Sequence, residues 1–148
     1  MSYTSITGRC LCGAVSFTVV GPVIAARQCW CRVCQTLSCG SGSNNIIVEG
    51  KDVTTEGHLS EYRSIADSGN RMVRSFCPKC GTQIFSASEA RPDLMVIRAG
   101  ALSDPEIAMP GAVIWTSSAP SWACIDETIP SFASQPGSLP NNDPDASR

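Results

Sequence analysis

The chain has 148 residues, of which 43% are hydrophobic, and its formal net charge is −2. This length and composition are typical of one globular domain with a single core. Acidic and basic residues are mixed, so the basic stripe typical of nucleic-acid-binding proteins is missing and the pattern disfavours a nucleic-acid partner. The sequence has neither an apolar run of ~18 residues nor an export signal, so we expect a cytoplasmic protein that is not bound to membranes.

Short apolar runs rich in β-branched residues follow one another along the chain and predict β-strands. Turn signals separate several of them, at 67–70, 90–93, 103–106 and 109–111. The expected strands cover residues 14–20, 45–50, 58–64, 70–76, 82–88, 94–100 and 112–118. One short helix is expected in "RVCQTL", directly after Cys31. Many short strands at near-regular spacing predict an all-β domain with little helix.

The C-terminal stretch from Ser134 differs from the rest of the chain. It reads "SQPGSLPNNDPDASR", with three prolines and almost nothing to bury. We therefore predict a single domain over residues 1–133 and a mobile tail over residues 134–148.

Nine cysteines occur in this chain, mostly in C-x-C and C-x-x-C spacings. In a secreted protein they would suggest disulfides. Here the count is odd and no export signal is visible, and in a reducing compartment such clusters are typical of metal ligands. The sequence favours metal binding over disulfides.

Two cysteine pairs are typical of a structural zinc site: Cys10 and Cys12 in "CLCG", and Cys77 and Cys80 in "CPKCG". Gly81 permits a turn with positive φ that lets backbone N–H groups point at sulfur, and Gly13 stands in the equivalent place. Together the pairs supply four thiolates for one zinc, which would tie the start of the chain to its middle.

The stretch "CWCRVC" adds Cys29, Cys31 and Cys34, and three thiolates from one loop can reach a second zinc. Water, a substrate or Cys39 could supply the fourth ligand. An open coordination position on the metal permits catalysis, whereas a fourth bond from Cys39 would make the site purely structural. The competing interpretation is that Cys39 is a thiol in a loop or in the core and binds no metal. Cys124 follows Trp122 in an apolar stretch and is predicted to lie in the core.

The order C-x-C-G, C-x-C-x-x-C and F-C-x-x-C-G-T resembles the glutathione-dependent formaldehyde-activating enzyme (Gfa) family, which is related to centromere protein V. The likeness continues through "AGALSDPE" and "IWTSSAPSWACIDETIPSF" and covers residues 8–133. The resemblance implies a fold of two packed antiparallel sheets with two zinc ions. It implies a structural zinc on Cys10, Cys12, Cys77 and Cys80, and a catalytic zinc on Cys29, Cys31 and Cys34. The family reaction joins formaldehyde and glutathione into S-hydroxymethylglutathione, a carbon–sulfur lyase step in reverse.

The sequence departs from the family pattern at three positions. Trp30 and Val113 stand where the family often has His, and Gln35 stands where it often has Arg. These changes make the site region less polar, which bears on the substrate more than on the fold or the zinc.

The donor set itself points to thiol chemistry. Three thiolates leave a zinc ion with a net charge near −1, which weakens it as an activator of water and suits a soft substrate thiol. The leading hypothesis is a zinc-dependent carbon–sulfur lyase acting on the adduct of an aldehyde and a small thiol such as glutathione. The alternative is a non-catalytic zinc module that binds a protein or nucleic acid. The oligomeric state is not indicated.

Several other residues have both a functional and an ordinary interpretation. Arg32, Arg74 and Arg98 could meet a substrate carboxylate or lie solvated at the surface. Trp30 could floor a pocket or pack in the core, and turn chemistry alone would explain Ser117 and Ser118, which with Trp122 are candidate pocket residues. His58 is the only histidine, and a surface or core position is expected for it.

Overall fold

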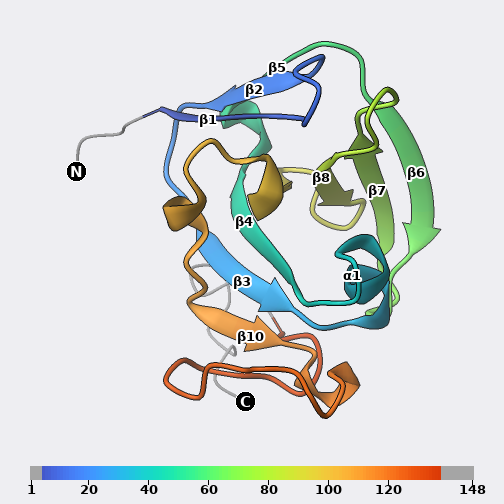
Figure 1. Ribbon diagram of the computed structural model, residues 1–148, viewed down its shortest axis with the longest axis vertical. Coiled ribbons are helices and arrows are strands. Elements are labelled where there is room, and N and C mark those ends of the chain that lie inside the picture. The colour runs from blue at the N-terminus through green and yellow to red at the C-terminus, as the bar shows by residue number, and fades with distance from the viewer. Residues whose placement is uncertain (1–4, 138–148) are drawn as a thin grey trace.

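The computed structural model describes residues 5–137 and is mostly β-structure (Figure 1). One short α-helix, α1 (Arg32–Leu37), interrupts the strands. The strands are β1 (Ile6–Arg9), β2 (Ser16–Val19), β3 (Ala25–Cys29), β4 (Ser43–Glu49), β5 (Val53–Glu56), β6 (Ser60–Ile65), β7 (Arg71–Phe76), β8 (Gln83–Ser88), β9 (Leu94–Arg98) and β10 (Ala112–Ile114). Three 3₁₀ turns lie between strands, η1 (Gly50–Asp52), η2 (Ala99–Ala101) and η3 (Pro105–Ala108), and η4 (Thr116–Ser118) follows β10.

The strands form two sheets, as expected. The smaller sheet has the antiparallel order β1-β2-β5 and lies at the top of Figure 1. The larger sheet has the order β10-β3-β4-β9-β8-β7-β6 and is antiparallel except for the parallel pair β10–β3. The prediction of an all-β fold with two antiparallel-rich sheets and little helix is confirmed.

The hydrophobic core fills the space between the two sheets. Phe17 of β2 and Phe85 of β8 meet edge to face, with ring centroids 5.2 Å apart. Alternate residues of β4 and β9, such as Ile46, Val48 and Ile97, are fully buried in the same core cluster. Because side chains alternate along a strand, the intervening residues of β4 and β9 face the other side of the large sheet, where the candidate site lies.

The predicted helix coincides with α1, and all seven predicted strands have a counterpart, but three strands were not expected. β1, β3 and β5 are short, and their sequences "ITGR", "AARQC" and "VTTE" carry a weak apolar pattern. The predicted strand over 112–118 is wrong beyond Ile114. Trp115 adopts a left-handed conformation with φ 61°, which ends β10 and starts the turn η4.

The segment after η4 returns alongside β10 at the bottom of Figure 1. Ser131 bridges Val113, and the Phe132 N–H donates to the Val113 carbonyl at 2.9 Å. Further on, the Trp115 indole N–H donates to Gln135 Oε1 at 3.1 Å. The mobile tail over 134–148 stays a prediction, and its residues 138–148 lie outside the described residues.

No helix in residues 5–137 is long and apolar enough to cross a membrane.

Candidate metal centres and cavity

The first cysteine cluster brings together the four thiols expected for a structural site. The sulfur atoms of Cys10, Cys12, Cys77 and Cys80 all lie within 4.8 Å of one another. Cys12 Sγ is 3.6 Å from Cys10 Sγ and 3.8 Å from Cys77 Sγ. With Zn–S bonds of about 2.3 Å, the edge of a tetrahedron is about 3.8 Å. The thiols therefore fit a tetrahedral zinc ion, and they join two segments separated by 65 positions.

Local backbone structure holds these sulfurs in place. Gly13 and Gly81 have φ values of 79° and 74°, as predicted for the turns after each pair. The Val15 N–H donates to Cys10 Sγ at 3.3 Å. The Thr82 hydroxyl lies 3.2 Å from Cys80 Sγ, and Thr82, first by this side chain and then by its backbone, lowers the pKa of Cys80 to about 5. Both contacts favour the thiolate form that binds metal.

The second cluster comprises Cys29, Cys31 and Cys34, whose buried sulfurs also lie within 4.8 Å of one another. Cys29 ends β3, Cys31 is the N-cap of α1, and Cys34 lies in the first turn of that helix. The Cys31 backbone is extended, with φ −60° and ψ 155°, so that its sulfur accepts the Cys34 N–H at 3.3 Å. The β3–α1 junction thus presents three thiols to one point, a donor set that suits zinc with an open fourth position.

No fourth Cys, His, Asp or Glu within residues 5–137 joins this second cluster. Cys39 is exposed in a turn beyond α1, with φ 57°, so the structure favours the three-ligand interpretation. His58 is exposed ahead of β6, consistent with a surface role. The prediction that Cys124 lies in the core is wrong, because the segment after η4 runs outside the sheets and leaves this thiol exposed.

A cavity of about 300 Å³ opens beside the second cluster, and all three cysteines line it. Its main wall is the face of the large sheet turned away from the core, with alternate residues of β3, β4, β7, β8 and β9. The β6–β7 turn, Arg91, Ile114, Trp115 and residues 135–137 complete the lining. The second cluster therefore faces a space large enough for a small molecule, whereas residues of the first cluster are not part of this lining.

Arginines dominate the charged groups of this cavity. Arg27, Arg74 and Arg98 all contribute to the wall, and Arg98 donates from Nη1 to Ser43 Oγ at 3.1 Å and to Asn45 Oδ1 at 2.8 Å. Asp67 also lines the cavity, where its Oδ2 accepts the Arg32 N–H at 3.1 Å. The cavity is thus biased towards anionic ligands.

The three thiols of the second cluster act on one another and on Arg98. Hydrogen bonds from Cys29 and Cys31, and then the charge and hydrogen bond of Arg98, lower the pKa of Cys34 to about 3. The neighbouring Cys31 and Cys34 thiols raise the pKa of Cys29. These contacts stabilise the thiolate form of Cys34, which is the form that binds metal.

Other predicted site residues lie elsewhere. Arg32 is exposed and contacts Gln35, so the surface interpretation holds for this arginine. Ser117, Ser118 and Trp122 do not line the cavity, which contradicts their place as pocket residues; Ser117 instead binds the Ala133 carbonyl. Sequence reasoning missed Arg27, because β3 was not expected, and it also missed Trp115 and Gln135.

The three positions that depart from the family pattern are buried. Trp30 is 2% exposed, packs edge to face on Trp122 with centroids 6.5 Å apart, and does not line the cavity, so its core interpretation holds. Gln35 donates from Nε2 to the Trp30 carbonyl at 2.7 Å and the Ser118 carbonyl at 3.0 Å. Val113 is buried in β10 opposite Gln28. Gln35 thus joins α1 to the segments that contain Trp30 and Ser118.

Comparisons with known proteins show the fold and the family of this chain. A crystal structure of a Rhodobacter sphaeroides protein shares the fold, with a TM-score of 0.52 and 22% identity, over 66% of this chain and 87% of that one. A Halomonas elongata protein named "Putative glutathione-dependent formaldehyde-activating enzyme" is 29% identical over 96 residues, or 61% of this chain. The match spans 60% of that relative's length. The family model for the glutathione-dependent formaldehyde-activating enzyme matches residues 5–118. The chain belongs to this family.

Proposed function

We propose that the protein is a zinc-dependent carbon–sulfur lyase that forms and cleaves the adduct of a small thiol, such as glutathione, with formaldehyde. The observation that carries this proposal is the second cluster, where three buried thiols meet at the wall of a cavity of about 300 Å³. Membership of an enzyme family named for this reaction supports it.

The two clusters have different roles in this proposal. Cys10, Cys12, Cys77 and Cys80 would hold a structural zinc, because their four sulfurs lie close enough to surround one tetrahedral metal ion. Cys29, Cys31 and Cys34 would hold the catalytic zinc. When bound there, the metal supplies an open position that lowers the pKa of a substrate thiol and fixes its sulfur beside the aldehyde.

The bond changes are simple. In the synthetic direction the substrate sulfur attacks the carbonyl carbon, a C–S bond forms, and the C=O π bond opens. The thiol proton ends on the new hydroxyl oxygen. No histidine lines the cavity among residues 5–137, whereas Ser86 and Ser88 present hydroxyl groups to it. We propose that these hydroxyls and water carry the proton.

The remaining parts of the proposal concern the whole protein. We propose one zinc domain over residues 1–133 and a cytoplasmic location, where the thiols stay reduced. Fractionation of cells with an antibody against the chain tests the location.

Exchange NMR with ¹³C-formaldehyde tests the reaction, because it measures the rate at which the thiol adduct forms and breaks. The protein should accelerate exchange with glutathione or another small thiol. Cys31→Ala should return the rate to that of the uncatalysed reaction, and the matched control Cys39→Ser should keep the acceleration. The proposal would be refuted if wild-type protein holding two metals accelerated the exchange with none of the small thiols tested.

A further inference from the structure

Two buried arginines occupy adjoining rows of the large sheet, on the face that forms the cavity wall. Arg98 of β9 pairs with Asn45 of β4. One row along, Val96 of β9 pairs with Ser86 of β8, which pairs with Arg74 of β7. Arg74 is 5% exposed and Arg98 is 8% exposed, and both line the cavity. Burial, followed by the charge of Arg98, lowers the pKa of Arg74, which indicates that the two guanidinium groups repel each other.

The hydrogen bonds of this arginine pair, Arg74 and Arg98, are incomplete. Arg74 donates from Nη1 to Ser64 Oγ at 2.6 Å, and Arg98 donates from Nη1 to Ser43 and Asn45. These three acceptors are neutral, and Arg98 also acts on the Cys34 thiol through its charge and a hydrogen bond. The Nε–H group of each arginine is buried and has no partner. A buried donor without an acceptor is unfavourable, so each guanidinium retains capacity for another acceptor.

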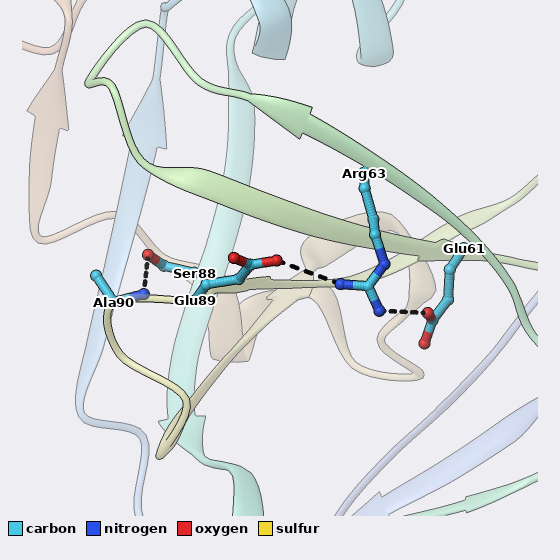
Figure 2. Close-up of polar contacts among 5 residues, drawn as sticks. All are labelled: Glu61, Arg63, Ser88, Glu89 and Ala90. Atoms are coloured by element: carbon cyan, nitrogen blue, oxygen red, sulfur yellow. Dashed lines mark hydrogen bonds and ion pairs between the residues drawn. The ribbon is translucent and has the colours of Figure 1, made fainter.

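The arginine pair also lacks a carboxylate partner. Figure 2 shows the contrast at Arg63, an exposed arginine of β6 that lies 3.4 Å from Glu61 and 3.3 Å from Glu89. Within residues 5–137, no ion pair involves Arg74 or Arg98, although both are far more buried. Buried charges are ordinarily paired, because removing them from water is costly.

Charges already in the cavity do not balance these cations. The second cluster with a zinc ion would carry a net charge near −1. Arg27, Arg74 and Arg98 together carry +3, and Asp67, which accepts the backbone N–H of Arg32 at the start of α1, adds one negative charge. Arg91 also lines the cavity, but its charge is balanced by Asp93 at 3.3 Å. The cavity therefore keeps an excess of about one positive charge, which one ligand carboxylate would neutralise.

We propose that the arginine pair is a binding subsite for a carboxylate group of the thiol substrate. Both arginines line the same cavity as Cys31 and Cys34, so the carboxylate and the sulfur of one small ligand can be held together. The ligand class is a mercaptocarboxylic acid whose carboxylate lies only a few bonds from sulfur. This inference rests on the proposed function, because the sulfur is assigned to the open position at the second cluster.

Binding calorimetry on the purified zinc protein tests the subsite with two thiols that differ mainly in charge, 3-mercaptopropionate and 3-mercaptopropanol. We expect 3-mercaptopropionate to bind at least about tenfold more tightly than 3-mercaptopropanol, because hydrogen bonds between charged groups are stronger than those to a neutral hydroxyl. Arg74→Gln should reduce this preference to about threefold or less. Arg63→Gln, the matched exposed control, should leave the preference unchanged.

Further measurements separate the possible failures. Metal analysis establishes that Arg74→Gln still holds two metals, and Arg74→Lys, which keeps the charge without the planar fork, should retain part of the preference. If both thiols bind wild type equally, the subsite is wrong while the proposed function stands. If neither binds and no thiol adduct forms, both are wrong. An unchanged preference in Arg74→Gln would also overturn the subsite.

Discussion

Replacing the exposed Cys12 by alanine should show how much of the unfolding free energy comes from metal binding, because this change removes little side-chain packing. Cys12 is the exposed member of the first cluster, so its removal leaves no cavity in the core, and any large destabilisation must come from the lost ligand. A metal at this cluster closes a loop of 65 residues between Cys12 and Cys77. The chain-entropy relation for such a cross-link gives about 4 kcal/mol at 25 °C. Because single domains have unfolding free energies of only ~5–15 kcal/mol, this loss is large.

Guanidinium denaturation with metal analysis of the same samples measures this effect. Cys12→Ala should lose the first metal and about 4 kcal/mol of unfolding free energy. The matched control is Cys39→Ala, which removes an exposed thiol that lies in neither cluster and should change the free energy by less than about 0.5 kcal/mol. Equal unfolding free energies for the two variants would refute the structural role of the first cluster.

Two further substitutions test the separate roles of the clusters, and a third tests backbone strain in the turn at Gly81. Cys31→Ala should lose only the second metal and the thiol exchange activity while keeping the fold; metal analysis and circular dichroism check this, and an unfolded variant would contradict it. Cys39→Ser should still hold two metals, and a second metal more easily removed by a chelator than in wild type would indicate that Cys39 is a ligand. Gly81→Ala should cost about 1–2 kcal/mol in thermal unfolding, because φ is 74° there although a methyl group would meet no atom within 4 Å; an unchanged melting temperature would contradict the strain.

The two cysteine clusters were the part of the site most readily predicted from sequence. C-x-C and C-x-x-C spacings fix sulfur positions through local backbone geometry, so both clusters form as predicted. The helix after Cys31 was also predictable, because Cys31 caps it and its six residues follow directly. Each cysteine pair and the helix depend on residues close together in the chain, whereas the meeting of the two pairs of the first cluster depends on the fold.

The cavity was harder to predict because its wall depends on strand pairing. Arg27 faces the site only because "AARQC" forms β3 between β4 and β10, a pairing that its weak apolar pattern does not indicate. Trp115 and Gln135 meet through a left-handed residue and a returning segment, which no local pattern indicates. The exposure of Cys124 has the same origin, since an apolar sequence can still run outside the core.

Counting thiolates on the second metal tests the central claim most directly. Cobalt substitution, with metal-edge X-ray absorption on the same sample, reports the sulfur ligands at each site. The structure predicts seven thiolates over two metals, four at the first cluster and three at the second, with a light atom or an added thiol in the remaining position. Eight protein thiolates over two metals would mean that the second site is closed, and would contradict an enzyme that works at that metal.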